Sequence, residues 1–224
     1  MKALFINGSP RKNFNTFKML ESAMKGASDA GAETELINLY DFNFKGCVSC
    51  FACKLKNDRT DGVCAFKDAL TPTLQKAREA DAIIIGSPVY YGYPTAQARA
   101  FLERLMFAAG TYLVDENGNY VRKFEKIIPT AMIYTMNCTE EIFDKVHYPV
   151  LLGVNVEYLQ KIFGYSEMLC AYNTYQFSDY SRYAVTMFKE EEKAKYRDEH
   201  FAKDLENAYG LGKRLVEKAK GVSK

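Results

Sequence analysis

The chain has 224 residues, of which 48% are hydrophobic and 26% charged, as is ordinary for a soluble globular protein. Its formal net charge of +2 is too small to favour nucleic acid or an anionic membrane surface as a partner. No apolar stretch is long enough to span a bilayer, and the short apolar run at the N-terminus does not resemble a signal peptide. We therefore expect a cytoplasmic protein that binds neither nucleic acid nor membrane.

Short apolar runs alternate with amphipathic segments along the chain, which predicts a series of strands and helices. The expected strands are residues 3–6, 33–39, 82–85, 127–134 and 167–172, with the third ended by residues 86–88. The expected helices are residues 14–30, 68–78, 95–107, 140–163 (interrupted around Pro149 and Gly153) and a terminal helix at about 189–218. Strands alternating with helices indicate a five-stranded parallel sheet with helices on both faces. The whole chain, residues 1–224, fits one doubly wound α/β domain with the flavodoxin-like strand order 2-1-3-4-5.

A polar loop follows the first strand and leads directly into the first helix. Such a helix N-terminus presents free backbone N–H groups and the positive end of the helix dipole to an anion. Ser9, Asn15 and Thr16 can add hydrogen-bond donors, and Arg11 can add positive charge. The loop matches neither the Walker motif nor the dinucleotide-binding motif, and its composition suits a monophosphate. The alternative is a plain helix cap with no ligand.

Two further loops should meet this one at the carboxyl ends of the strands. Residues 87–94 contain two prolines, one glycine and three tyrosines, which together favour a flat heteroaromatic ligand. Residues 134–137 follow the fourth strand. A phosphate at one end and a planar ring at the other describe FMN better than a sugar phosphate. The alternatives are a packed turn for residues 87–94 and a simple strand end for residues 134–137.

These two motifs, GSPR with Asn15-Thr16 and then GSPVYYG, resemble the NADPH-dependent FMN reductase family of flavodoxin-like proteins. The resemblance covers residue 1 to about residue 137. It implies a homodimer or homotetramer that passes hydride from NAD(P)H through FMN to an acceptor. It also implies cofactor-binding residues in all three loops: Ser9, Arg11, Asn13, Asn15, Thr16, Pro88, Val89, Tyr90, Tyr91, Gly92, Tyr134, Thr135, Met136 and Asn137.

Four cysteines lie in a long loop at about residues 40–67: Cys47, Cys50, Cys53 and Cys64. Closely spaced thiolates can hold an iron–sulfur cluster or zinc, and this segment resembles the iron–sulfur flavoprotein branch, which would place a [4Fe-4S] cluster here. The gap before the last cysteine is longer and more charged than in that branch. The alternative is therefore a loop with free thiols near the flavin.

Three functions follow from this sequence. The first is an FMN-dependent oxidoreductase that uses NAD(P)H to reduce a quinone, a flavin or another small acceptor. No catalytic side chain is assigned, because the flavin carries the chemistry. The second is an FMN electron carrier that exchanges electrons with ferredoxin-like partners, and the third is a non-enzymatic module that senses a phosphate ligand. The tyrosine-rich loop at residues 173–183 either covers the flavin or the partner subunit, or packs on the terminal helix.

Overall fold

Five parallel strands form the centre of the structure, a computed structural model that describes residues 1–222. Their order is β2-β1-β3-β5-β6, which is the expected 2-1-3-4-5 order when the parallel strands are numbered along the chain. A short strand that was not expected, β4, pairs antiparallel with the end of β3. The bounds are β1 Lys2–Asn7, β2 Glu33–Asn38, β3 Ala82–Tyr90, β4 Tyr93–Pro94, β5 Thr130–Thr135 and β6 Ser166–Ala171.

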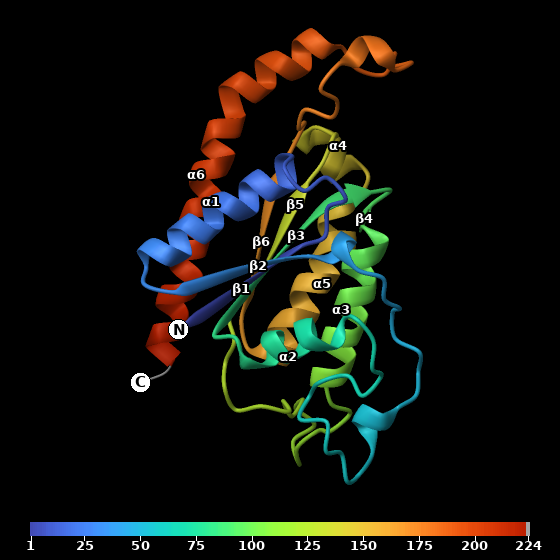
Figure 1. Cartoon of the computed structure of the whole chain (residues 1–224), viewed down its shortest axis with the longest axis vertical. Helices are drawn as coiled ribbons and strands as arrows, with labels where there is room; N and C mark the ends of the chain where they lie inside the picture. Colours follow the sequence, from blue (N-terminus) through green and yellow to red (C-terminus); the bar gives the residue numbers. More distant parts are fainter. Residues whose placement is uncertain (223–224) are drawn as a thin grey trace.

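Helices cover both faces of this sheet (Figure 1). Their bounds are α1 Asn15–Asp29, α2 Thr71–Glu79, α3 Ala96–Ala109, α4 Glu140–Lys145, α5 Tyr148–Phe163 and α6 Glu190–Val222. Side chains of α1 and α6 form one buried cluster with one face of the sheet, while α2, α3 and α5 form another with the opposite face. Because both faces are covered, the central strands are almost wholly apolar.

Helices α1 and α6 cross in close contact at two glycines. A Cβ atom on Gly26 would lie 2.0 Å from the carbonyl oxygen of Tyr209, and one on Gly212 would lie 1.9 Å from that of Ala23. Only glycine allows the two backbones to approach this closely. The crossing fixes α6 along α1, so that α6 begins above the carboxyl edge of the sheet (Figure 1).

Most boundaries shift by one to three residues, and two elements differ more from those expected. Strand β3 continues through Gly86, Ser87 and Pro88 to Tyr90, because its pairing with β5 extends to Pro88. The helical region at 140–163 is interrupted at Val146 and His147, before Pro149. Pro149 lies in the first turn of α5, where a missing N–H group costs nothing.

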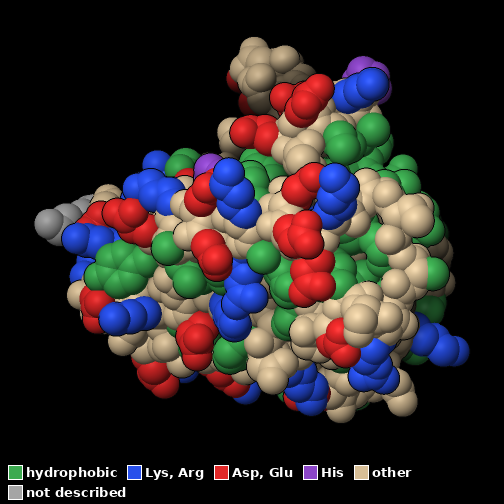
Figure 2. Space-filling view, turned by 90° about the horizontal axis from the view of Figure 1, so that it is seen from above, with side chains coloured by type: hydrophobic (Ala, Val, Ile, Leu, Met, Phe, Trp, Pro, Cys, Tyr) green, Lys and Arg blue, Asp and Glu red, His purple; other side chains and the backbone are tan. Residues whose placement is uncertain are grey.

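The long loop at residues 40–67 is present, with short 3-10 turns at Leu39–Asp41 (η1) and Ala52–Lys54 (η2). A third, η3, lies at Tyr180–Arg182, between β6 and α6. Among residues 1–222, no helix combines the length and apolar character that crossing a membrane requires. Seen from above, basic and acidic side chains are interspersed over the surface, and neither sign forms a continuous patch on this face (Figure 2).

Candidate functional site

A cavity lies at the carboxyl ends of β1, β3 and β5, where the three polar loops meet. Ten of the fourteen residues expected to bind a cofactor line it: Ser9, Arg11, Asn15, Thr16, Pro88, Val89, Tyr90, Thr135, Met136 and Asn137. Phe14, Thr174 and Gln176 complete the lining. Because the parallel strands end at a common crevice, the fold brings together most of the expected site residues.

The loop after β1 is held from below by a buried asparagine. The Asn7 side chain donates to Asn38 Oδ1 over 2.9 Å and accepts the backbone N–H of Ser9 over 3.0 Å. The Ser9 hydroxyl in turn accepts the backbone N–H of Arg11 over 3.1 Å. Phe14 is the N-cap of α1 and provides no side-chain acceptor, so the first-turn N–H groups gain no side-chain cap.

The three loops are bonded to one another as well as to their strands. Thr95, at the start of α3, donates its hydroxyl to the Gly8 carbonyl over 2.6 Å and its backbone N–H to Ser87 Oγ over 3.0 Å. The buried hydroxyls of Thr16 and Thr135 lie 2.8 Å apart. These bonds fix the relative positions of the loops without a ligand.

Residues 173–177, which we call the strap, lie over the loop that follows β1. The Arg11 guanidinium donates to the Gln176 carbonyl, and the Asn15 side chain donates to the Tyr175 carbonyl over 2.7 Å. The strap also contacts the terminal helix, because the Tyr175 hydroxyl lies 2.6 Å from Glu190 Oε1. The segment thus packs on α6, as one alternative expected, and it borders the cavity; whether it covers a bound flavin stays a prediction.

The cavity is rich in hydrogen-bonding groups and positive at one end. Arg11 stacks its guanidinium 4.0 Å from the centre of the Phe14 ring, and partial burial lowers the pKa of Arg11. Burial also raises the pKa of Tyr90, which keeps its phenol neutral. The Asn137 Oδ1 atom is buried and has no hydrogen-bond partner among residues 1–222. An unpaired buried acceptor in a cavity wall is suited to a ligand that donates a hydrogen bond.

Four expected cofactor residues do not line the cavity. Asn13 is exposed, and Tyr91, with 99% of its surface accessible, lies in the turn between β3 and β4 with Gly92. Tyr134 is wholly buried in the core, where Asn155 donates to its hydroxyl over 3.2 Å. Successive side chains of a strand point to opposite faces, so Thr135 at the cavity places Tyr134 on the other side.

Phe14, Thr174 and Gln176 were not among the expected cofactor residues, although Thr174 and Gln176 lie in the 173–183 loop, for which covering the flavin was one alternative. Thr174 and Gln176 follow β6, whose carboxyl end lies at the same edge of the sheet as those of β3 and β5. The crevice rule applied to the fifth strand supports placing this segment at the site. The sequence does not indicate a role for Phe14 at the site, because an apolar residue beside a helix start usually belongs to the core.

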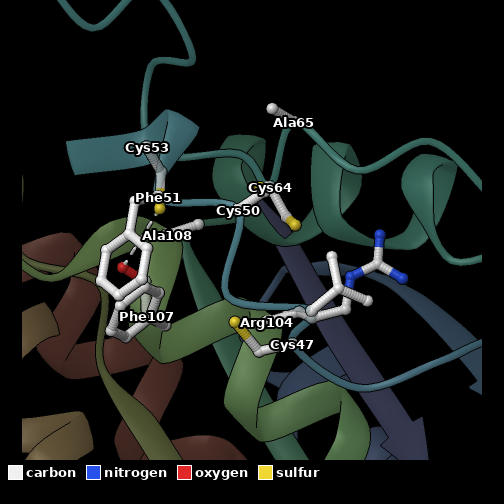
Figure 3. A pocket seen from close by; sticks show the side chains of 10 residues that line it. Cys47, Cys50, Phe51, Cys53, Cys64, Ala65, Arg104, Phe107 and Ala108 are labelled. Atoms are coloured by element: carbon white, nitrogen blue, oxygen red, sulfur yellow. Dashed lines mark hydrogen bonds between the residues drawn. The ribbon is translucent and has the colours of Figure 1, made fainter. Parts of the chain in front are cut away.

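The four cysteines of the long loop line a different pocket, beside α3 (Figure 3). Cys53 and Cys64 are buried, whereas Cys50 is exposed. Burial raises the pKa of the Cys53 thiol, an effect opposed by the nearby charges of Lys54 and Lys123. Within residues 1–222, no three cysteine, histidine or acidic side chains converge closely enough to hold a metal ion. The cysteines therefore share a pocket without forming the geometry of a metal centre.

Known proteins match about half of this chain in sequence. The model of the NADPH-dependent FMN reductase family matches residues 1–123. An iron–sulfur flavoprotein of Methanocaldococcus jannaschii is 38% identical over 104 residues, which are 46% of this chain and 51% of that protein. One of Archaeoglobus fulgidus is 42% identical over 108 residues, which are 48% of this chain and 50% of that protein. The match thus spans about half the length of these curated relatives.

Solved structures match the fold over nearly the whole chain. An NAD(P)H:quinone oxidoreductase from Methanothermobacter marburgensis has a TM-score of 0.63 at 18% identity, covering 96% of this chain and 98% of that one. An FMN-dependent NADH-azoreductase from Bacillus anthracis, solved with FMN, has a TM-score of 0.62 at 14% identity, covering 96% and 99%. At these identities the likeness shows a common flavodoxin-like fold. Because the family model covers more than half of the 224 residues, including the loops after β1 and β3, this chain belongs to the NADPH-dependent FMN reductase family.

Proposed function

We propose that this protein binds FMN in the cavity at the carboxyl edge of the sheet and acts as an oxidoreductase. The reaction would take hydride from NAD(P)H and deliver it to a quinone, a flavin or another small acceptor. The observation that carries this proposal is the uncapped start of α1, which faces a cavity lined by Arg11, Asn15 and Asn137, whose Oδ1 atom is buried without a hydrogen-bond partner among residues 1–222. Such a set of groups suits a ligand with an anionic end and a hydrogen-bond donor elsewhere.

The residues of the cavity divide by their chemistry. Ser9, Arg11, Asn15 and Thr16 would hold the phosphate, with the N–H groups of the first turn of α1. Residues 88–90 offer rigid backbone and one aromatic ring, which would support the planar end. Residues 135–137 form the opposite wall. Bound FMN supplies the hydride chemistry, so the chain itself needs only to bind, orient and shield the ring.

Binding of FMN tests the proposal directly. Quenching of FMN fluorescence on titration with the purified protein should give a dissociation constant, and the complex should be reduced by NADH or NADPH without air. Arg11→Met should weaken FMN binding about tenfold by removing a charge from the phosphate end. Lys12→Met is the matched control, because Lys12 is exposed and pairs with Asp41 away from the cavity. No binding by the parent protein at high micromolar FMN would refute the proposal.

A second proposal is that the protein is an electron carrier with an iron–sulfur cluster on Cys47, Cys50, Cys53 and Cys64. Its support is that all four line one pocket and that relatives are named iron–sulfur flavoproteins. The thiols as placed do not converge on a metal, so the loop would have to close around a cluster. Analysis of iron and sulfide in protein purified without air decides this proposal, and trace iron alone would reject it. Faster reduction by ferredoxin than by NAD(P)H would favour the carrier function.

We also propose that the protein assembles as a homodimer or homotetramer. Exposed apolar side chains of the 110–121 excursion and of α5 support this, because they border a broad open groove beside α3: Tyr112, Leu113, Val114, Val154 and Tyr158. Light scattering coupled to size-exclusion chromatography measures the mass directly. A monomer across micromolar concentrations would contradict the proposal.

A further inference from the structure

Lys193, in the first turns of α6, is one of the few fully buried charged side chains, with 2% of its surface exposed. Its ammonium donates to the Asn137 carbonyl over 2.7 Å and to Asn173 Oδ1 over 2.7 Å. It also lies 4.8 Å from the centre of the Phe188 ring. Both acceptors are uncharged, so neither neutralises the ammonium. Burying a charge costs free energy unless hydrogen bonds or a nearby opposite charge compensate for the lost hydration.

One acceptor of Lys193 lines the cavity, and the other, Asn173, directly precedes the lining residue Thr174. Asn137 lines the cavity and carries the unpaired Oδ1 atom. Asn173 begins the strap, with a positive φ of 48° and a backbone N–H that donates to the Cys138 carbonyl over 2.7 Å. The next strap residue, Thr174, donates its backbone N–H to the Met136 carbonyl over 2.9 Å. Lys193 therefore joins the loop after β5 to the strap from behind the cavity.

We propose that Lys193 is a positioning residue for the anionic ligand of this cavity. Its ammonium holds Asn137 and Asn173 in place and adds a fixed positive charge behind the wall that faces the ligand. The inference rests on the proposed function, in which that ligand is FMN. It assigns to α6, which lies beyond the matched residues 1–123, a direct part in building the site.

If Lys193 has this role, the affinity of the cavity for an anion should depend on pH. Burial lowers the pKa of Lys193 to about 8, opposed by the Cys138 thiol, whose own pKa burial raises. On α6 itself, Glu190 bonds with Tyr175 and Glu192 pairs with Lys189. An anion in the cavity stabilises the charged form of Lys193. The affinity of the protein for that anion should therefore fall as the pH rises through the pKa of Lys193.

The test compares FMN affinity in four proteins at about pH 7 and about pH 9, on either side of the Lys193 pKa. At the lower pH, Lys193→Met should bind FMN about tenfold more weakly than the parent, and Lys193→Arg should stay within about threefold because it keeps the charge. The parent should lose affinity between the two pH values, whereas Lys193→Met should not. Lys195→Met, altered at an exposed position of the same helix, should behave as the parent. Riboflavin, which lacks the phosphate charge, should show a weaker pH dependence.

A second measurement needs no ligand. Hydrogen exchange at the Asn173 and Thr174 amides, which are bonded to Cys138 and Met136, should be about tenfold faster in Lys193→Met than in the parent. If the parent itself binds no FMN, the proposed function fails, and this exchange still decides whether Lys193 positions the strap. Unchanged exchange would overturn the inference. So would equal FMN affinity in the parent and Lys193→Met, or an equal loss of affinity in the Met and Arg variants.

If Lys193→Met does not fold, the parent and Lys193→Arg are compared instead. The guanidinium of Lys193→Arg stays charged at both pH values, so this variant should lose less FMN affinity than the parent between them. An equal loss of affinity in both proteins would count against the role of Lys193.

Discussion

The buried Arg104 donates to the partly exposed Asp68 over 2.6 Å, and this ion pair closes the base of the cysteine-containing loop. The same guanidinium donates to the carbonyls of Lys45, over 3.2 Å, and Phe66, over 2.6 Å. Those carbonyls lie two residues before Cys47 and two residues after Cys64. One side chain of α3 therefore holds both ends of the loop and keeps its first and last cysteines at one pocket (Figure 3).

Breaking this pair should both destabilise the protein and release the loop. Arg104→Met leaves the Asp68 carboxylate without its partner, and the free energy of unfolding should fall by about 3 kcal/mol. Asp68→Asn should also be destabilising, because the amide leaves the wholly buried Arg104 guanidinium without a counter-charge. In both variants the buried thiols of Cys53 and Cys64 should react faster with a thiol reagent than in the parent. Urea unfolding and labelling kinetics measure the two effects.

Lys203→Met provides the control for that experiment. Its ion pair with Glu206 is exposed on α6, so removing it should change the free energy of unfolding by less than about 1 kcal/mol. Equal stability of Arg104→Met and the control, or unchanged thiol reactivity, would show that the ion pair does not anchor the loop.

The sequence predicted the sheet well because its central strands are short, continuous apolar runs. Residues 82–85 carry the pattern of a strand covered on both faces, and β3 begins there; β5, at 130–135, overlaps the strand expected at 127–134. The strand order and the meeting of three loops then follow from general rules of α/β folds. The cavity was predictable to this extent without any contact information.

Long-range side-chain contacts were not predictable in the same way. Lys193 reads as one more charged residue in a polar helix, and Arg104 as one in an amphipathic helix. Each becomes distinctive only because the fold buries it against carbonyl oxygens from distant segments. Tyr134 shows the opposite case, since its position beside Thr135 suggested the cavity, whereas the alternation of β5 directs it to the core.

Tyr134→Phe separates a role in stability from a role in cofactor binding. The substitution removes the hydroxyl that accepts a hydrogen bond from Asn155 in the core. The free energy of unfolding should fall by about 1 kcal/mol, while FMN affinity should stay within about twofold of the parent. Thermal unfolding and FMN titration of the same preparation give both values. A large loss of FMN affinity with unchanged stability would show that Tyr134 takes part in cofactor binding.

The strap should slow the escape of FMN from the cavity. Tyr175 anchors it through its hydroxyl bond to Glu190, and this bond raises the pKa of Tyr175 to about 12. Tyr175→Ala should increase the FMN dissociation rate about tenfold, and Tyr175→Phe, which loses only the hydrogen bond, about threefold. Stopped-flow fluorescence measures these rates. Tyr91→Ala, at an exposed position outside the cavity, should leave the rate unchanged, and the same rate in all three variants would exclude a covering role for the strap.

Asp204 should make the protein more stable in mild acid than at neutral pH. Burial raises its pKa to about 6, an effect that His200 opposes. A carboxyl group whose pKa is higher in the folded state contributes stability below its unfolded pKa and loses it as the pH rises through the folded value. Asp204→Asn removes the cost of the buried charge, so at about pH 7.5 it should raise the free energy of unfolding by about 1–2 kcal/mol. The carboxyl is partly exposed, so this gain in stability should be smaller than the full pKa shift would give.

At about pH 4 the gain in stability should disappear, because the parent carboxyl is then protonated in the folded state. Asp198→Asn, at an exposed position of the same helix, serves as the control, and a gain independent of pH would show that Asp204 is not the group responsible.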